Sequence, residues 1–421
     1  MATPKHSTTP DQSVQGVLAA AEAAHHAETM AAARKFEAAA SWAELHPGPA
    51  VVPVVDEVGE LLMYGDQPVA LAGEGAPTVA EFCVAEFAAA VGMSTPAGRR
   101  FIGAALETKH RLPLLWDQVM TGRVAAWKAR RVTEHTHRLP PEGAAHVDAV
   151  LAKVAATCSF AHLDRTAERA AAEYDNEHHE ADREQGTDGT YFEILFGAAT
   201  IRPGLVSIRG ALEHTDALAL ETALKAGAHA LGVEHPELPL DVRRAKALGL
   251  LADQTLAGNE SGVGGRELVI YTHHDTRQTH GIVGVEGTGS VFTIEQLAEW
   301  CQHANTRVSI RPVLDLDEDL STDSYAPTAR QREQAILTCP TCVFPGCARS
   351  ARRCDLDHIT AWAAGGATES WNLAPLCRLH HRLKTHGHWT YTRLTKTSFE
   401  WTSPLGRVYL SDLTHKRRRT P

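Results

Sequence analysis

The sequence predicts a mainly α-helical protein with an α+β portion and a small, zinc-stabilised C-terminal module. Three observations predict this class. Amphipathic segments with helical spacing follow one another through the first half of the chain. Beyond Gly189, short runs typical of strands interrupt that pattern. Between Cys339 and His386 lie five of the eight cysteines, interspersed with histidines at spacings typical of a metal site. At 421 residues the chain is long enough for two to three units.

A helical bundle is expected over residues 14–188, after a polar tail at 1–13 that contains two prolines and is expected to be disordered. Residues 14–46 are rich in Ala and also contain Glu and Leu, which favour a long helix, and the chain then breaks at Pro47-Gly48-Pro49. Further amphipathic helices are predicted at 78–94, 98–110, 113–121, 124–138, 141–158 and 160–184.

An α+β part is expected over residues 189–311. Strands are predicted at 191–196 and 205–209, and again at 267–272 and 281–285 as a second pair. Helices are predicted near 213–229, 239–257 and 294–303. The bundle and this part form one mostly helical domain, 14–311. A polar linker, 312–338, joins it to a C-terminal module at 339–410 and a basic tail at 411–421.

Two pairs of soft ligands about thirty residues apart predict a structural zinc site. The preferred ligands are Cys342, Cys347, Cys377 and His380. Pro345-Gly346 can form a tight turn that lets the first two thiolates converge. Cys339 with Cys342 is a competing first pair. Disulfides or buried free thiols are the alternative, but disulfides need an oxidising compartment, and the N-terminal residues lack the apolar core of a secretion signal.

A second group, made of Asp357, His358, Asn372 and His381, has a spacing that suits metal-assisted phosphodiester cleavage. An imidazole can activate water, and a bound metal ion can neutralise the phosphate and the leaving alkoxide. Residues 355–359 alternate as a short strand does, and Gly365-Gly366 predicts a loop. Asn372 is expected to cap the next helix, with Pro375 in its first turn. On that helix Cys377 and His380 share a face, whereas His381 is rotated by about 100°.

These residues carry a resemblance: the segment 342–391 resembles the HNH endonuclease module, whose ββα-metal fold holds one divalent ion between a hairpin and a helix. The resemblance implies that His358 is the general base and that Asp357 and His381 bind the catalytic ion, which could be Mg²⁺, Mn²⁺, Ni²⁺ or Zn²⁺. It also implies that Asn372 orients the loop beside the base. Several family members place another histidine four residues after the last one. Here that position is Thr385, with His386 one residue late, so no third protein ligand is assigned.

Further segments carry a second resemblance, which covers most of the chain. They are Leu112-Pro113, Gly122-Arg123-Val124 and residues 203–221, 311–315, 326–334, 342–347 and 401–407. They are similar to the helical domain, catalogued as domain of unknown function 222, that precedes HNH modules in an actinobacterial repeat family. This resemblance implies no activity for the larger domain.

Positive charge is concentrated in the last ninety residues. Residues 330–421 carry 15 Lys and Arg against 6 Asp and Glu, a balance of +9, whereas the whole chain is −10 and residues 1–329 are therefore −19. A polyanion is the expected partner of the basic part. The candidate DNA-binding residues are Arg353, Arg378, Arg382 and Lys384. A solvated basic face that only balances an acidic domain is the alternative.

The sequence therefore predicts a metal-dependent HNH endonuclease that hydrolyses DNA phosphodiester bonds, with one catalytic divalent ion, one structural zinc and no organic cofactor. The alternative is a catalytically silent, zinc-stabilised module that binds DNA or protein. No run of 18 apolar residues occurs, so no membrane span is expected, and a cytoplasmic location is the default.

Overall fold

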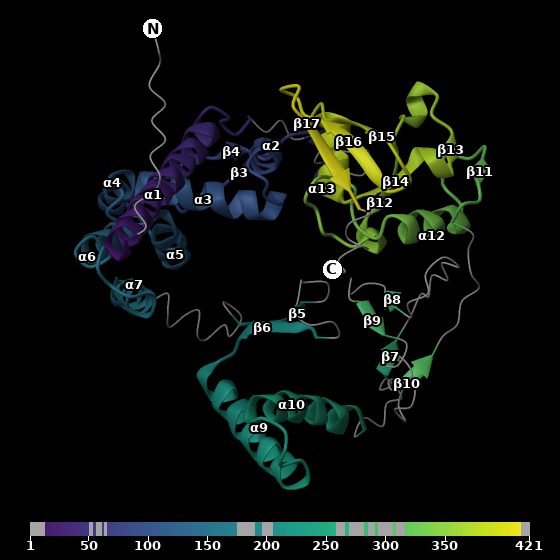
Figure 1. Ribbon diagram of the computed structural model, residues 1–421. Helices are drawn as coiled ribbons and strands as arrows, with labels where there is room; N and C mark the ends of the chain where they lie inside the picture. The colour runs from purple at the N-terminus through teal and green to yellow at the C-terminus, as the bar shows by residue number, and fades with distance from the viewer. Residues whose placement is uncertain are drawn as a thin grey trace. The chain divides into compact units, whose positions relative to one another are not determined.

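A computed structural model describes residues 13–49, 65–174, 190–195, 205–257 and 316–413, together with the backbone of short strands outside these ranges. The described chain is mainly helical with small, mostly antiparallel sheets, which confirms the predicted class at this level (Figure 1). It divides into two compact units, Met1–Glu180 with Asp317–Pro421, and Ala181–Leu316. The first unit thus contains both the predicted bundle and the predicted C-terminal module, which are far apart in sequence.

The helices of the bundle begin where side chains or prolines satisfy the exposed amide groups of the first turn. Ser13 caps the first helix by accepting a hydrogen bond from the amide of Gly16 at 3.0 Å. Prolines occupy the first helical position of two others. The helices are α1 (Val14–Glu44), α2 (Cys83–Ala90), α3 (Thr95–Arg111), α4 (Pro113–Met120), α5 (Ala126–Thr136), α6 (Pro141–Leu151) and α7 (Phe160–Tyr174).

Two helices of the bundle differ from the prediction. The helix expected at 78–94 begins only at Cys83, because the Asp66 carboxylate accepts the Phe82 amide at 2.9 Å and so fixes the start of α2. The preceding strand β4 (Val79–Ala80) instead pairs with β3 (Pro68–Val69). The helix expected at 141–158 ends at Leu151.

Beyond Leu151 the chain turns, and the Lys128 ammonium donates to the carbonyl oxygens of Ala155 and Cys158, at 2.7 and 3.0 Å. These two carbonyl oxygens thus accept from a side chain in place of a further turn of helix. A strand pair that the sequence did not predict is β1 (Val54–Val55) with β2 (Leu61–Leu62). Of the predicted tail at 1–13, residues 1–12 lie outside the described residues, and Ser13 is the N-cap of α1. The end of the last predicted bundle helix, 175–184, also lies outside the described residues.

The core of the bundle is built from apolar side chains that recur at helical spacing. Phe36 of α1 is fully buried and meets Phe101 of α3 edge-on, with ring centroids 5.6 Å apart. The other large side chains that are fully buried here are Ile102, Leu106, Leu112, Leu115, Leu151 and Leu163. This core holds α3 in place, and the first turn of α3 contributes to the metal centre described below.

The second unit contains the predicted strand pair β5 (Tyr191–Leu195) and β6 (Ser207–Ala211), followed by α9 (His214–Glu234) and α10 (Leu240–Ala257). The other predicted pair is wrong. Strand β7 (Arg266–Leu268) pairs in parallel with β10 (Thr306–Val308), and β8 (Ile282–Gly284) pairs with β9 (Val291–Thr293). Strand periodicity does not specify a partner, so the pairing could not be read from it. The predicted helix at 294–303 lies outside the described residues.

The C-terminal part of the first unit begins inside the predicted linker, which is not a plain connector. It contains β11 (Ser321–Thr322) and α12 (Ala329–Thr338), which opens with a capping box between Thr328 and Gln331. Next come β12 (Asp355–His358), β13 (Thr368–Glu369), β14 (Leu373–Leu376) and α13 (Arg378–His386). The sheet of β15 (Thr390–Arg393), β16 (Ser398–Thr402) and β17 (Val408–Asp412) follows, drawn in yellow in Figure 1.

Two details of the predicted helix after Asn372 are wrong. Pro375 lies in β14, where Leu356 of β12 is its antiparallel partner. The helix starts later, at Arg378, and Cys377 is its N-cap residue. Asn372 therefore caps no helix, because residues 373–376 satisfy their backbone groups in a sheet ladder instead.

One apolar cluster joins residues 339–413 to the helical segment of the first unit, which contains α1 to α7. Phe344, Trp389, Trp401 and Phe399 are almost completely buried in it. Phe82 and Ala85, from the start of α2, belong to the same cluster. The helical segment therefore supplies part of the core on which the C-terminal site is built.

Candidate metal centre and catalytic cleft

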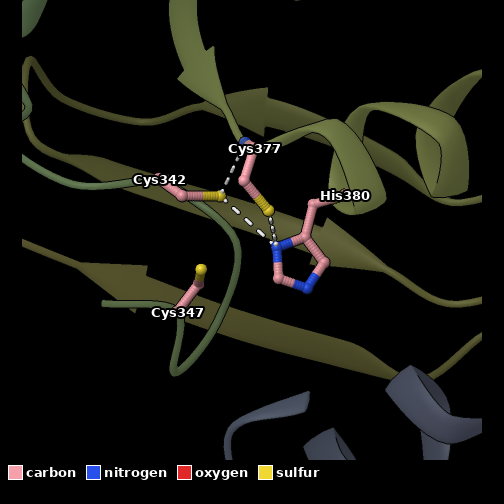
Figure 2. A group of neighbouring side chains, drawn as sticks. All are labelled: Cys342, Cys347, Cys377 and His380. Carbon is pink, nitrogen blue, oxygen red and sulfur yellow. Dashed lines mark hydrogen bonds between the residues drawn. The ribbon is translucent and has the colours of Figure 1, made fainter. Parts of the chain in front are cut away.

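Four buried or half-buried ligands converge in the C-terminal part: Cys342, Cys347, Cys377 and His380 (Figure 2). Their ligand atoms all lie within 4.8 Å of one another. His380 Nδ1 is 3.4 Å from Cys342 Sγ and 3.2 Å from Cys377 Sγ. Tetrahedral zinc, with Zn–S near 2.3 Å and Zn–N near 2.1 Å, requires S···N separations of about 3.6 Å. The group could therefore hold a metal ion such as zinc.

The local sequence explains how the ligands converge. The turn that carries the first two cysteines closes with the Cys347 amide donating to the Phe344 carbonyl at 3.1 Å. Gly346 has φ +71°, a left-handed conformation that favours glycine. Cys377 lies at the N-cap of α13 and His380 one turn later, so both side chains reach the same point.

A bound cation would stabilise the thiolate forms of Cys342 and Cys347. Burial raises the pKa of Cys342 well above its ordinary value, and hydrogen bonding to Cys342 raises that of Cys347. A bound divalent ion reverses this effect, because it stabilises the thiolate form directly. The competing ligand Cys339 lies elsewhere, with its Sγ 3.5 Å from the Lys396 carbonyl oxygen.

The helical segment completes the surroundings of this cluster. Thr95, in the first turn of α3, places its hydroxyl 2.9 Å from His380 Nε2, the ring nitrogen that faces away from the cysteines. Both residues are buried, with 5% and 2% of their surface exposed. Phe344 stacks on the His380 ring at a centroid distance of 3.8 Å. No local sequence pattern indicates this role of Thr95, which is 285 positions from its partner.

His381, the next residue of α13, contacts two aspartates instead of the cysteines. His381 Nε2 lies 3.2 Å from Asp357 Oδ1, and its Nδ1 lies 2.9 Å from Asp355 Oδ2. The hydrogen bond to Asp357 raises the pKa of His381. The sequence reasoning missed Asp355, although it lies two positions before Asp357 on a strand and so shares its face.

Asp357 is a buried carboxylate with several cationic or donor neighbours. Burial alone would raise its pKa, but His381, Lys384 and Tyr391 outweigh that effect and hold the pKa below its ordinary value. The Tyr391 hydroxyl donates to Oδ2 at 2.9 Å, and the Lys384 ammonium donates to Oδ1 at 3.1 Å. Ligands about 2.1 Å from an octahedral ion lie about 3 Å apart, so Asp357 Oδ1 and His381 Nε2 could share one ion.

His358 follows Asp357 on β12 and is 6% exposed. Burial lowers the pKa of its imidazole, which favours the neutral form at pH 7. Its Nε2 lies 2.8 Å from the Thr368 hydroxyl, which in turn donates to the Tyr325 carbonyl at 3.4 Å. Because that hydroxyl has one hydrogen, it accepts from His358 Nε2, and the other ring nitrogen carries the free lone pair.

Asn372 holds the loop that follows His358. Its side-chain oxygen accepts the Thr360 amide at 2.8 Å, and its amide nitrogen donates to the carbonyls of Thr360 and Ala367 at 3.1 and 2.9 Å. At Gly366 a Cβ would come within 1.9 Å of the Thr360 carbonyl oxygen, so this close approach requires glycine. The predicted loop at 365–366 is therefore fastened at both ends.

These side chains line a cleft of about 490 Å³, hereafter the His358 cleft. Its lining includes Tyr325, Asp357, His358, Trp362, Arg378, His381, Arg382, Lys384 and His386. Imidazole, carboxylate and arginine groups thus share one concave site, which can hold a cation and an anion together.

The four predicted DNA-binding residues lie in different surroundings. Arg378 is 77% exposed at the cleft and lies 3.2 Å from Asp355. Arg382 is directed to the helical segment, where it pairs with Glu81 at 2.9 Å. Lys384 donates to Asp357, as described above, and to the His358 carbonyl at 2.6 Å. Arg353 is exposed.

Comparison with known proteins identifies the larger part of the chain. Residues 65–337 match the family model described as "Domain of unknown function (DUF222)". An uncharacterized protein of Mycobacterium tuberculosis, Rv3776, is 26% identical over 346 residues, which cover 72% of this chain and 65% of the relative. Another, Rv2100, is 35% identical over 122 residues, or 29% of this chain and 22% of the relative.

The chain thus spans less than two thirds of the length of these relatives. No solved structure matches it. Within the described residues, no helix combines the length and apolar character needed to cross a membrane.

Proposed function

Because the chain belongs to the DUF222 family, whose description names no activity, we propose a function from its own site: a metal-dependent HNH endonuclease that hydrolyses DNA phosphodiester bonds. The observation that carries the proposal is the pairing of Asp357 and His381 at 3.2 Å beside the buried imidazole of His358. The order of β12, β14 and α13 around this group supports the ββα arrangement of HNH modules.

In the proposed reaction His358 accepts a proton from the attacking water. The Thr368 hydroxyl fixes the imidazole through Nε2, and the ring is stacked against Tyr325 at a centroid distance of 5.4 Å. The lowered pKa of the ring keeps a lone pair available at neutral pH. Asn372 acts as a positioning residue, because it fixes the loop that starts directly after Ile359.

Asp357 and His381 would hold the catalytic ion. When bound, that ion supplies positive charge to the scissile phosphate and the leaving 3′ oxygen. Asp355 and Tyr391 orient the two ligands, since they hydrogen-bond to His381 and Asp357 respectively. Arg378, which is exposed at the cleft, would contact a neighbouring phosphate of the DNA.

Zinc in the cysteine–histidine cluster would have a structural role. Its four protein ligands leave no open position for substrate, which is typical of structural sites. The cluster joins the turn at Cys342 and Cys347 to the start of α13. It therefore fixes the helix that carries His381.

One observation favours a second candidate, a catalytically silent module that binds DNA or protein. The Lys384 ammonium lies 3.1 Å from Asp357 Oδ1 and so competes with a divalent ion for that oxygen. In this alternative the ammonium permanently takes the place of the ion. The two candidates differ in cleavage, not in zinc content or DNA binding.

The test is nicking of supercoiled plasmid by the full-length protein with Mg²⁺, Mn²⁺, Ni²⁺ or Zn²⁺. We expect nicking with at least one ion and its loss in His358→Ala. His162→Ala, on the exposed surface of α7, is the matched control and should nick like the wild type. A wild-type protein that binds the plasmid but leaves it intact with every ion would refute the enzyme and favour the silent module.

A further inference from the structure

A second cleft, of about 580 Å³, lies in the helical segment between α3, α5 and the chain at Ala70 and Leu71. No residue of the proposed reaction lines it. The charged residues of its lining are mostly arginines: Arg99 and Arg100 from α3, Arg130 from α5 and Arg138 just beyond, together with His137, Glu107 and Glu134. This arginine cleft therefore needs an explanation that the proposed nuclease site does not give.

The acidic groups of the arginine cleft are already neutralised by other residues. Glu107 is buried and accepts hydrogen bonds from Arg111 and Thr136 through Oε1, at 2.5 and 2.8 Å. Its Oε2 accepts the Gly73 amide at 2.8 Å. Glu134 pairs with Arg131. Each of these carboxylates thus already pairs with an arginine, Arg111 or Arg131, that does not line the cleft.

Three of the cleft arginines are not neutralised by a described carboxylate. In the part of the chain that the structure describes, Arg99, Arg100 and Arg130 form no ion pair, and all three are exposed. The Arg130 guanidinium lies 5.2 Å from the centre of the Phe101 ring, a cation–π contact that orients it. Clustered like charges repel one another, and an anion between them would relieve that repulsion.

The wall opposite these helices is fixed by close packing. A Cβ on Gly103 would lie 2.2 Å from the Leu71 carbonyl oxygen, so α3 meets this segment backbone to backbone. At Gly73 a Cβ would lie 1.9 Å from the Arg111 guanidinium, beneath the cleft. The arginines therefore project from a rigid surface, which favours a preformed binding site.

The net charge of the surrounding sequence also favours an anionic ligand. Although residues 1–329 are strongly acidic in total, residues 65–174 carry twelve Lys and Arg and twelve Asp and Glu. Residues 95–138, which contain α3, α4 and α5, carry nine Lys and Arg and only three Asp and Glu. The acidic excess thus lies in other parts of the sequence, and the arginine cleft lies in a basic one.

We propose that the arginine cleft is a second binding site for phosphate groups of the DNA backbone, with Arg99, Arg100 and Arg130 as the contacting residues. Guanidinium groups bind phosphate through two parallel hydrogen bonds, which suits a cleft with several arginines and no free carboxylate. Such contacts give affinity without sequence preference. The choice of DNA as the phosphate carrier rests on the proposed function.

The distance between the two clefts is compatible with one duplex. Arg382, which lines the His358 cleft, donates to the Gly65 carbonyl at 2.6 Å, and Ala70 lines the arginine cleft. Five residues of chain span at most about 18 Å. About five base pairs of DNA, each rising about 3.4 Å, cover the same length. The chain between Gly65 and Ala70 is therefore no longer than a short segment of duplex.

The experiment measures DNA affinity as a function of salt. Full-length protein carrying His358→Ala is titrated into a fluorescently labelled duplex without added divalent ions. It is compared with a triple variant in which Arg99→Gln, Arg100→Gln and Arg130→Gln are added. The matched control adds Lys153→Gln, Arg165→Gln and Arg169→Gln, three exposed residues outside the cleft, so the change in net charge is the same.

We expect the cleft variant to bind more weakly and its plot of log affinity against log salt to become shallower by about 2 to 3, since each phosphate contact contributes about 0.9. The control variant should keep the slope of the His358→Ala parent. Replacing the same three arginines with lysine should retain most of the salt dependence of the His358→Ala parent, because the positive charge remains. Circular dichroism of each variant verifies the fold.

Two outcomes would overturn the proposal: equal slopes for the cleft variant and its parent, or equal losses in the cleft and control variants. A third arm titrates inorganic phosphate and a mononucleotide. If either binds in the cleft at micromolar concentration while the DNA slope is unchanged in the cleft variant, the ligand is a small phosphate compound and the DNA assignment is wrong.

Failure of this proposal is distinguishable from failure of the proposed function. Binding is measured in the His358→Ala background, where cleavage is not needed as a readout. A shallower slope in the cleft variant, combined with a wild-type protein that never nicks plasmid, supports the arginine cleft and refutes the nuclease. Nicking by the wild type with unchanged slopes supports the nuclease and refutes the arginine cleft.

Discussion

Replacing Thr95 with valine removes one hydroxyl at nearly constant shape, and we expect this change to weaken zinc binding by roughly ten- to a hundredfold. The hydroxyl lies 2.9 Å from His380 Nε2 in a buried environment. If His380 binds zinc through Nδ1, its Nε2 must carry a hydrogen, which then needs an acceptor. A buried donor without a partner costs about 1–3 kcal/mol, equivalent to about 5- to 150-fold in affinity. The loss calculated from the unsatisfied donor thus agrees with the ten- to hundredfold loss expected for a residue that hydrogen-bonds to a metal ligand.

The assay is competition for zinc between the full-length protein and a chromophoric chelator of known affinity. Thr95→Ser retains the hydroxyl and should bind zinc like the wild type. Thr108→Val is the matched control on the same helix, because its buried hydroxyl donates to the Ala104 carbonyl at 2.7 Å and has no contact with the cluster. It should change stability without changing zinc affinity.

Wild-type zinc affinity in Thr95→Val would contradict this expectation. It would mean that the hydrogen bond between α3 and the cluster does not support the metal ligand. An equal loss in Thr108→Val would also refute it, because the effect would then follow from destabilising α3 as a whole.

Three other predictions concern single residues. Cys342→Ala should lose stoichiometric zinc while Cys339→Ala retains it, and one zinc per chain in Cys342→Ala by elemental analysis would contradict the ligand set. Asn372→Ala, which removes three hydrogen bonds to the loop after His358, should lower the nicking rate at least tenfold; an unchanged rate would exclude a positioning role. The hydrogen bond from Arg131 lowers the pKa of Asp164 from 3.8 to about 2, so the stability it adds is complete above about pH 4 and is lost as the pH falls through about 2. Urea unfolding free energies of wild type and Asp164→Asn should therefore converge over this interval, and a constant difference would contradict the ion pair.

Local patterns made the metal cluster predictable from the sequence. Cys342 and Cys347 are joined by a turn whose glycine is visible in the sequence, and Cys377 and His380 are separated by about one helical turn. The alternation of residues 355–359 predicted strand β12, which the structure confirms. In each case the signal lies within a few residues, so backbone geometry alone relates sequence to structure.

Contacts between distant segments could not be predicted in this way. Thr95 and Glu81 reach the C-terminal part through tertiary packing, and nothing in their local sequence indicates a partner about 300 positions away. The same reason explains why the protein partners of Arg382 and Lys384, which were predicted to bind DNA from their charge, were not expected. Charge predicts what a side chain can bind, whereas packing determines which partner lies nearest.

The helix boundary after Asn372 shows a different limit. Asn followed by proline three residues later is a reasonable helix start, and the same residues also fit an edge strand before a helix. Pairing with β12 decides between them, because Leu373 to Leu376 are all buried and pair with the strand that carries His358. The sheet partner was thus the missing information.

The central claim is that adjacent histidines have separate roles: His380 holds the structural zinc, and His381 the ion of the reaction. The most direct measurement compares His380→Ala and His381→Ala for zinc content and for plasmid nicking in the same preparations. We expect His381→Ala to retain one zinc per chain and its fold but not to nick, whereas His380→Ala should lose the zinc. Loss of zinc in His381→Ala, or nicking by it at the wild-type rate, would contradict the account.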